Sequence, residues 1–218
     1  MKGTQLIKVH HLGISQSERI VWQCEELNLD YQLLRYDRDP VSRRAPLEYK
    51  ALSRLGIAPV IEDGDLVLGE SGAIVEYISR RYANGRLIPG PGDAGFVDFL
   101  FWFHFANGTL VPSIMMDLSA LRLGLPAKPA ATKAQGSRTD GAYDAIEQRL
   151  GAAAYMAGDE FTAADIMMFF PLTTMRFFAP RDLTPYPNVR AYVRRVGERP
   201  AYRRAMAKAD PDFAPLLS

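Results

Sequence analysis

Two periods of hydrophobic residues occur in the first part of the chain. Short apolar runs at 5–10 and 31–36 are rich in β-branched and aromatic residues, which is typical of buried strands. Between them, apolar residues from Ile20 to Leu27 recur at helical spacing. A strand, a helix and a second, parallel strand connect by a right-handed crossover, so this region predicts a βαβ unit.

A second group of predicted elements follows. A short strand is entered through Pro59, turns at Asp63-Gly64-Asp65 into another strand, and leads to a helix that starts at Glu70-Ser71. The N-terminus of a helix offers free N–H groups to an anion, so this stretch could clamp a small peptide-like acid. With a basic helix predicted at 42–53, the order βαβαββα indicates one α/β domain.

Beyond this domain the periodicity is helical throughout. The stretch at 85–93 is rich in Pro and Gly, which continue neither a helix nor a sheet. Helices are then predicted at 94–122 (bent near Gly108 or Pro112), at 133–150, after Thr162, from Tyr186 and from Arg199. We therefore predict an α/β domain at 1–84, a linker at 85–93 and an all-α domain at 94–218.

Several helix starts carry capping patterns. Thr162-x-x-Asp165 precedes an apolar run, which Pro171 should kink or break. Ser15-x-x-Glu18 also matches a capping box, and Ser17 is the alternative cap for the same helix.

Composition narrows the function classes. Lys and Arg number 26 against 25 Asp and Glu, a net charge of +1, and no basic run predicts a nucleic-acid partner. The single cysteine, Cys24, excludes an internal disulfide framework and a Cys-rich metal site. No secretory leader or bilayer-length apolar run is recognised, so we expect a cytoplasmic protein with no membrane partner.

Three motifs resemble the soluble glutathione transferase superfamily, and the resemblance covers essentially the whole chain. They are Ala58-Pro59-Val60, the stretch from Asp63 to Ile74, and Gly158-Asp159-Glu160-Phe161-Thr162-Ala163-Ala164-Asp165-Ile166. The resemblance implies a thioredoxin-like N-terminal domain, an all-α C-terminal domain and a homodimer. It also implies glutathione as co-substrate, with no metal.

The same resemblance assigns the glutathione site. Pro59 should be cis, with the backbone of Ala58 bonded to the cysteinyl part of the peptide, while Glu70 and Ser71 hold the γ-glutamyl end. A plain helix cap is the alternative for that pair. Arg44 should bind the glycyl carboxylate, and Arg43 is the alternative. A third interpretation is that both arginines are simply solvated surface charges. Ile57 stands where many relatives have Lys or Gln, so one contact to the peptide is expected to be missing.

Catalysis by this family requires a thiolate. A free thiol has a pKa near 8.5, and each unit of lowering takes about 1.36 kcal/mol of preferential interaction with the anion. Ser15, in the loop after the first strand, matches the serine of the theta- and zeta-like classes, and Ser17 is the alternative.

The three histidines have structural interpretations. His10 and His11 end the first strand, and no Asp or Ser stands at a spacing that defines a triad. His104 lies among aromatic residues. It could line the pocket for the second substrate, and a place in the core or at an interface is at least equally expected.

The second substrate should be an apolar electrophile between the two domains, a usual place for apolar pockets. About half of the candidate wall residues are expected to touch it: Trp102, Phe103, Met115, Met116 and Phe177. The predicted function is a glutathione transferase. The alternatives are a non-catalytic binding or scaffold module and a glutathione-dependent disulfide or peroxide reductase using the same site.

Overall fold

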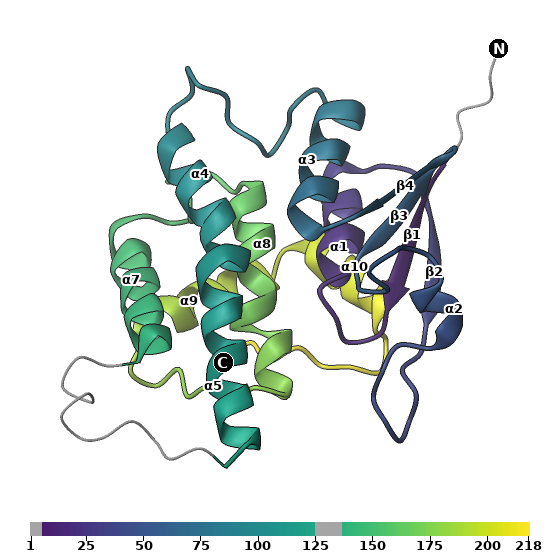
Figure 1. Cartoon of the computed structure of the whole chain (residues 1–218). Helices are drawn as coiled ribbons and strands as arrows, with labels where there is room; N and C mark the ends of the chain where they lie inside the picture. Colours follow the sequence, from purple (N-terminus) through teal and green to yellow (C-terminus); the bar gives the residue numbers. More distant parts are fainter. Residues whose placement is uncertain (1–5, 125–136) are drawn as a thin grey trace. The chain divides into compact units, whose positions relative to one another are not determined.

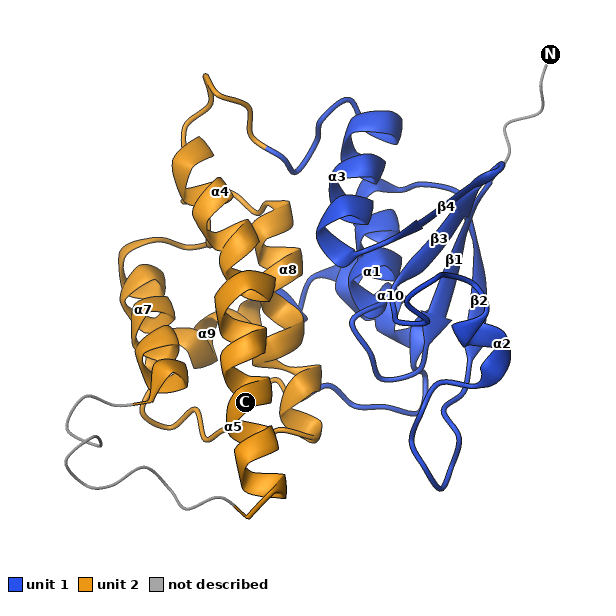
Figure 2. Cartoon of the chain, in the orientation of Figure 1, with its two compact units in different colours: residues 1–88, 196–215 blue, residues 89–195, 216–218 orange. Residues whose placement is uncertain are grey.

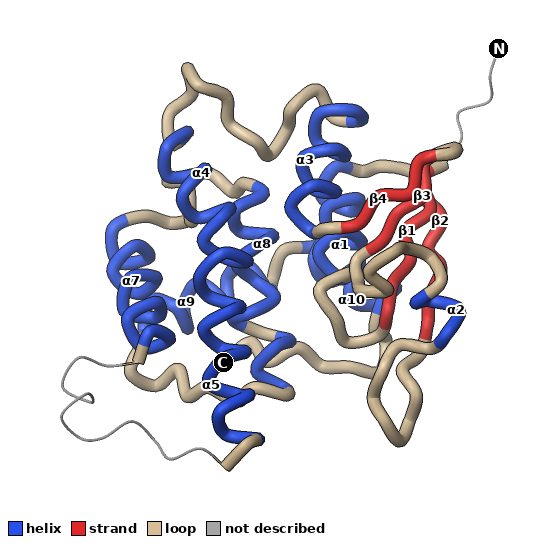
Figure 3. Tube along the Cα trace, in the orientation of Figure 1, coloured by secondary structure: helices blue, strands red, loops and turns tan. Residues whose placement is uncertain are grey.

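Four short strands form one mixed sheet in the order β2-β1-β3-β4 (Figure 3). β1 (Ile7–Leu12) runs parallel to β2 (Tyr31–Tyr36) and antiparallel to β3 (Val60–Asp63). β3 pairs with β4 (Leu66–Gly69) across a turn in which Gly64 has a φ of 62°, a conformation that favours glycine. The predicted βαβ unit and hairpin are confirmed.

Four helices accompany this sheet: α1 (Glu18–Leu27), α2 (Leu47–Lys50), α3 (Ser71–Tyr82) and α10 (Pro200–Ala209) (Figure 1). Asn28 ends α1 in the left-handed conformation, as expected for a polar residue after the last helical turn.

The predicted helix at 42–53 is wrong in its extent. Only Leu47–Lys50 is helical, and Pro46 occupies the position before it in an extended conformation. A proline disfavours the helical conformation of the residue preceding it, so the helix cannot begin earlier than Pro46. Arg43 and Arg44 consequently belong to a loop.

A long helical stretch follows the linker. It consists of α4 (Phe96–Phe105), a π-helical turn (Ala106–Leu110) and α5 (Val111–Arg122). The bend predicted near Gly108 or Pro112 falls where the π-helical turn separates α4 from α5, and Pro112 lies in the first turn of α5.

Three further α-helices belong to this part: α7 (Arg138–Ala152), α8 (Ala163–Leu172) and α9 (Pro187–Gly197). Thr162 and Asp165 form the predicted capping box of α8. Pro171 allows one more helical residue before a 3₁₀ turn, Thr174–Phe177, takes over.

The computed structural model describes residues 6–124 and 137–218, so the first residues of the helix predicted at 133–150 lie outside the described part. One described helical stretch, Phe96–Arg122, is long and apolar enough by composition to cross a membrane. Core helices of soluble proteins meet the same criterion.

The chain divides into two compact units (Figure 2). The first contains the residues up to Ile88 together with Val196–Pro215, and the second contains Pro89–Arg195 with Leu216–Ser218. The predicted helical domain at 94–218 therefore contains α10, which the structure groups with the sheet.

Contacts between α10 and α1 explain this grouping. Trp22 meets Tyr202 edge to face with ring centroids 5.0 Å apart, and Arg199 forms two hydrogen bonds to Glu26 of 2.7 and 2.9 Å. Glu25, which is buried, accepts a 3.0 Å hydrogen bond from Arg204. An edge-to-face aromatic pair and charge-assisted hydrogen bonds each add about 1 kcal/mol or more beyond simple burial, so α10 has stronger partners on α1 than sequence distance suggests.

Candidate functional site

The loop between β1 and α1 contains two buried serine hydroxyls. Ser15 is 5% exposed and Ser17 is fully buried. The Ser15 hydroxyl donates to the carbonyl of Leu12 at 2.6 Å and lies 2.7 Å from the Ser17 hydroxyl. The Ser17 oxygen accepts the backbone N–H of Leu12 at 3.1 Å.

These hydroxyls do not form the predicted capping box. Ser17 is the residue before α1, its backbone is helical rather than extended, and no side-chain cap is present. An N-cap side chain accepts from the second or third helical N–H, which requires extended backbone at the cap. The serines are turned instead toward β1 and toward each other.

His11 extends this group of polar atoms into the protein. Its Nδ1 lies 2.9 Å from the Ser17 hydroxyl, and its Nε2 lies 3.0 Å from Oδ2 of Asp210, the residue that ends α10. His11 is fully buried and Asp210 is 5% exposed. Spacing along the chain identified no Asp or Ser as part of a triad with these histidines. In the fold, Ser17 and Asp210 both contact His11, because Asp210 is distant in sequence but adjacent in space.

The loop itself is fixed by two charged side chains. Oδ1 of Asp210 accepts the N–H of Ile14 at 3.1 Å. Arg38 donates to the carbonyls of Gly13 at 2.8 Å and Ile14 at 3.3 Å, and burial lowers the pKa of its guanidinium. Ile14 has a φ of 51°, an uncommon conformation for a β-branched residue, and these three contacts hold it there.

His10 points to other partners. Its ring nitrogens lie 3.0 Å from the Tyr36 hydroxyl and 3.0 Å from a carboxylate oxygen of Glu62. Burial lowers the pKa of His10, and the nearby charge of Glu62 partly opposes that effect. These contacts agree with the structural, non-catalytic role predicted for His10.

The start of α3 is linked to α1 through a buried arginine. Arg19 is fully buried, donates to Gln16 at 2.6 Å and lies 3.4 Å from the Ser71 hydroxyl. Burial lowers the pKa of Arg19 to about 9, so it still carries its charge at neutral pH. Ser71 is buried as the first residue of α3, Glu70 is exposed just before it, and neither side chain caps the helix. The plain-cap alternative is therefore wrong.

The remaining predicted glutathione contacts belong to the same unit. The Ala58–Pro59 peptide bond is cis, as predicted. Ile57 is 52% exposed. Arg43 and Arg44 are both exposed in the loop before α2, and Arg43 has a φ of 58°.

The predicted electrophile residues fall into two groups. Trp102 and Phe103 are buried, at 6% and 2% exposure, whereas Met115, Met116 and Phe177 are 40%, 61% and 54% exposed. His104 is exposed on α4. The structure thus leaves only the second group of three with substantial apolar surface.

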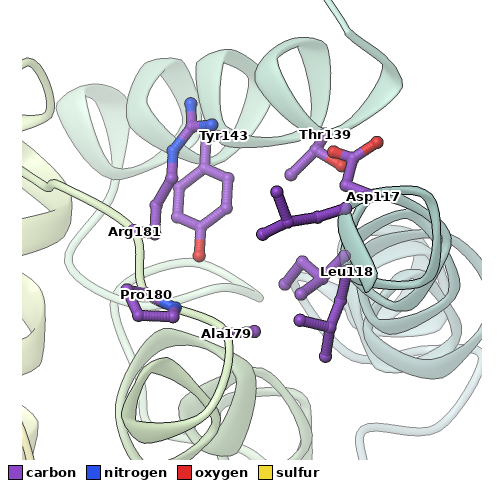
Figure 4. A pocket seen from close by; sticks show the side chains of 9 residues that line it. Asp117, Leu118, Thr139, Tyr143, Ala179, Pro180 and Arg181 are labelled. Carbon is purple, nitrogen blue, oxygen red and sulfur yellow. The ribbon is translucent and has the colours of Figure 1, made fainter. Parts of the chain in front are cut away.

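A separate cavity of about 160 Å³ occurs within the helical unit (Figure 4). Its lining is Ile114, Asp117, Leu118, Leu121, Thr139, Tyr143, Ala179, Pro180 and Arg181. Arg181 stacks over the Tyr143 ring at 4.7 Å and forms a 2.7 Å ion pair with Asp140. None of the predicted electrophile residues lines this cavity.

Three site residues were missed at the level of sequence: Arg19, Arg38 and Asp210. For Arg19, the sequence offered one indication, its position in an amphipathic helix directly after the serine loop. A charged residue that is buried at such a position normally has a partner. Within residues 6–124 and 137–218, no group of three His, Cys, Asp or Glu side chains is arranged to hold a metal ion.

Both halves of the sequence match known families. Residues 4–80 match the family described as "Glutathione S-transferase, N-terminal domain", and residues 129–195 match "Glutathione S-transferase, C-terminal domain".

Individual proteins match along nearly the whole length. "Glutathione S-transferase 3" of Schizosaccharomyces pombe is 34% identical, with 98% of this chain and 92% of that protein covered. "Glutathione S-transferase 1" of Saccharomyces cerevisiae is 28% identical, with 94% and 95% covered. The crystal structure of a glutathione S-transferase from Actinobacillus pleuropneumoniae is 30% identical, covers 96% of this chain and 97% of its own, and superposes with a TM-score of 0.83.

Proposed function

The chain belongs to the glutathione S-transferase family and is a glutathione transferase, and from that premise we propose which of its residues bind glutathione and activate its thiol. Glutathione binds along the first unit at Ala58, Glu70 and Ser71, and Ser15 stabilises its thiolate. The observation that carries this assignment is the hydrogen-bonded link through Arg19, which ties the serine-bearing start of α1 to Ser71.

Ser15 is the group that meets the sulfur. Its hydroxyl already lies in a polar cluster, and its single proton can turn from the Leu12 carbonyl to an anion. Hydrogen bonds to a charged acceptor are stronger than bonds to a neutral one. A lowering of the thiol pKa by two units requires about 2.7 kcal/mol, which one such bond and the field of α1 can supply.

The γ-glutamyl end binds at the N-terminus of α3. The first intrahelical hydrogen bond runs from Ile74 N–H to the Glu70 carbonyl, and the earlier N–H groups have no side-chain cap. These groups and the Ser71 hydroxyl suit the α-carboxylate. Glu70, exposed beside them, suits the α-ammonium.

The glycyl carboxylate binds Arg44, with Arg43 as its neighbour in the same exposed loop. An exposed arginine contributes less than a buried one, because solvent screens its charge. This end is therefore the weaker part of the clamp, and Ile57 adds no polar contact beside it.

The electrophile binds the exposed apolar side chains Met115, Met116 and Phe177, with Trp102 and Phe103 as buried support. Methionine side chains adapt to ligands of different shape. The substrate class is accordingly an apolar, aromatic or aliphatic electrophile.

The enzyme acts as a cytoplasmic homodimer. A reducing compartment keeps the glutathione thiol available. An interface is supported by three exposed apolar residues on one face of α4: Val97, Leu100 and Phe101 are 74%, 40% and 56% exposed. Large exposed apolar patches commonly mark protein–protein contacts.

The assignment is tested with four variants, Ser15→Ala, Ser17→Ala, Ser71→Ala and Arg35→Ala, the last as an exposed control on β2. Equilibrium binding measures glutathione affinity, and ultraviolet absorbance of the thiolate against pH gives the pKa of the bound thiol. We expect Ser15→Ala to raise that pKa by at least about one unit with affinity little changed. Ser71→Ala should weaken binding and leave the thiol pKa unaltered. An unchanged thiol pKa in Ser15→Ala would refute the role given to Ser15.

A further inference from the structure

Four buried side chains form a continuous line of hydrogen bonds in the first unit. They are Ser15 in the β1–α1 loop, Ser17 at the start of α1, His11 in β1 and Asp210 at the end of α10. The successive distances are 2.7 Å between the two hydroxyls, 2.9 Å from Ser17 to His11 Nδ1 and 3.0 Å from His11 Nε2 to Asp210. None of the four is more than 5% exposed.

The line has the composition of a hydrolytic Ser-His-Asp triad but not its accessibility. A nucleophilic serine must reach a substrate carbonyl, and Ser17 is fully buried. Its oxygen also accepts the N–H of Leu12. A covalent role for Ser17 is therefore excluded, and the line can act on a substrate only through Ser15 at its outer end.

The number of protons limits how the line can be arranged. A carboxylate only accepts, so the proton on His11 Nε2 points to Asp210. In the neutral imidazole, Nδ1 is then an acceptor and takes the single proton of Ser17. Ser15 can donate to Ser17 or to the Leu12 carbonyl. Its oxygen accepts the backbone N–H of Ser17 at 3.3 Å and keeps a second lone pair for a donor from outside.

We propose that this line carries the thiol proton of bound glutathione to His11 and that Asp210 stabilises the resulting imidazolium. The proposal rests on the assignment of Ser15 to the sulfur made above. The thiol S–H bond breaks as an O–H bond forms on Ser15, the former Ser15 proton passes to Ser17, and the former Ser17 proton passes to Nδ1 of His11. Both hydroxyls stay neutral, and the products are one thiolate and one imidazolium.

The shift also turns every donor toward the sulfur. After it, His11 donates to Ser17, Ser17 donates to Ser15, and Ser15 donates outward to the thiolate. Before it, Ser17 donates to His11, and the Ser15 hydroxyl, which donates to the Leu12 carbonyl in the resting state, turns to donate to Ser17 as the thiol proton arrives. A thiolate is therefore matched by a full set of oriented donors, whereas a thiol is not, which is the preference that lowers a pKa. His11, Ser17 and Asp210 act only through Ser15, so they are positioning residues.

Charged residues also occur on the neighbouring elements. Arg38, in the loop after β2, lies near Asp210, Arg35 is the β2 partner of His11 in the parallel register, and Glu18 is buried at the start of α1. Asp210 contacts His11 directly, so its carboxylate has the strongest interaction with a positive charge on the imidazole, because Coulomb energy falls with distance.

The test compares His11→Asn with His10→Asn. The two histidines are adjacent, both are buried, and only His11 belongs to the line. Two quantities are measured with glutathione: the pKa of the bound thiol, and the protons released to the buffer per thiolate formed, from calorimetry in buffers of different ionisation enthalpy. All proteins are compared at the same neutral pH, with the thiolate fraction of each taken from its absorbance.

In the wild type we expect almost no proton to reach the buffer for each thiolate formed, because His11 keeps it. His11→Asn should release about one proton per thiolate, raise the thiol pKa by about one unit, and leave glutathione affinity within about twofold. His10→Asn should behave as the wild type. Release of one proton per thiolate by the wild type would overturn the proposal.

Serine variants keep the test decisive if His11→Asn fails to fold. Ser17→Thr retains the hydroxyl and should keep the wild-type proton count, whereas Ser17→Ala should lose it. Equal proton counts in these two variants would contradict the relay. If Ser15→Ala shifts the thiol pKa but the Ser17 and His11 variants do not, the relay is wrong and the role of Ser15 stands. If Ser15→Ala has no effect either, the proposed function of the loop is wrong.

Discussion

At the scale of single residues, the first unit contains a fully buried arginine, Arg19, although charged side chains are rarely buried completely. Its guanidinium links α1 to Ser71 at the start of α3. A buried arginine is tolerated where its guanidinium donates to several acceptors at once. On the assignment proposed above, its place beside Ser71 gives it the role of positioning that serine relative to the loop that carries Ser15.

We predict that Arg19→Lys weakens glutathione binding by about tenfold, equivalent to about 1.4 kcal/mol. One guanidinium nitrogen, Nη1, donates to both Gln16 and Ser71. Lysine keeps the positive charge, but its side chain is one atom shorter and its ammonium is more strongly hydrated, so it is a poor substitute at this buried position. Equilibrium binding by calorimetry measures the change.

Arg35→Lys on β2 is the control for the same substitution at an exposed site, and it should bind as the wild type does. Equal affinities in the two variants would mean that charge alone, and not geometry, is what Arg19 supplies.

At the scale of elements, two helices start with the same cap in different surroundings. α7 begins with Ser137 and Asp140, and α8 begins with Thr162 and Asp165, each pair forming a complete capping box. Asp140 is partly exposed and pairs with Arg181, whereas Asp165 is fully buried. Asp165 also accepts the N–H of Met156 at 2.9 Å and the hydroxyl of Tyr192 at 3.0 Å, so it joins α8 to a loop and to α9.

We predict that Asp165→Ala lowers the free energy of unfolding by about 3 kcal/mol or more, because it leaves buried donors without an acceptor. Asp140→Ala, the matching change in α7, should cost about 1 kcal/mol, the usual value of a cap. Urea denaturation measures both. A similar cost at the two sites would show that burial of the box adds nothing.

Asp165 also makes stability depend on pH. Burial raises its pKa to about 6 from an ordinary value of 3.8, although four hydrogen bonds oppose the rise. The folded state therefore binds more protons than the unfolded state between those pH values, and stability falls as pH rises through them. Relative to Asp165→Asn, the wild type should lose up to about 3 kcal/mol between pH 4 and pH 7. A constant difference between the two proteins across that range would contradict the raised pKa.

At the scale of the whole molecule, exposed apolar surface remains on both units. On α4 it consists of Val97, Leu100 and Phe101, and on the edge strand β4 it consists of Leu66 and Val67, at 39% and 49% exposure. An edge strand carrying such residues is normally covered. The proposed homodimer accounts for such surface, because a two-fold interface buries the same patch of both copies.

We predict that Phe101→Glu converts the protein to a monomer. A buried carboxylate without a partner disfavours association by several kcal/mol. Sedimentation equilibrium should give about 24.3 kDa for the variant and twice that for the wild type. Val41→Glu, at a 91% exposed loop position, is the control and should leave the wild-type mass unaltered.

Local patterns were sufficient for most of the fold and for part of the site. Short apolar runs and turn residues predicted the strands, and helical periodicity and capping motifs predicted the long helices. Motifs identified Pro59, Glu70-Ser71 and the serine loop. The extent of the helix at 42–53 was wrong because periodicity alone does not register the restriction that Pro46 places on the residue before it.

The sequence by itself thus determined the βαβαββα order, the helical remainder and the family resemblance, because each depends on residues close together in the chain. Only the tertiary structure decided that α10 joins the first unit, that Arg19 reaches Ser71, and that Asp210 meets His11 across 199 positions of sequence. Such pairings follow from how whole elements pack, and no local spacing encodes them. The serine loop was visible in the sequence, but the buried line behind it came only from the folded chain.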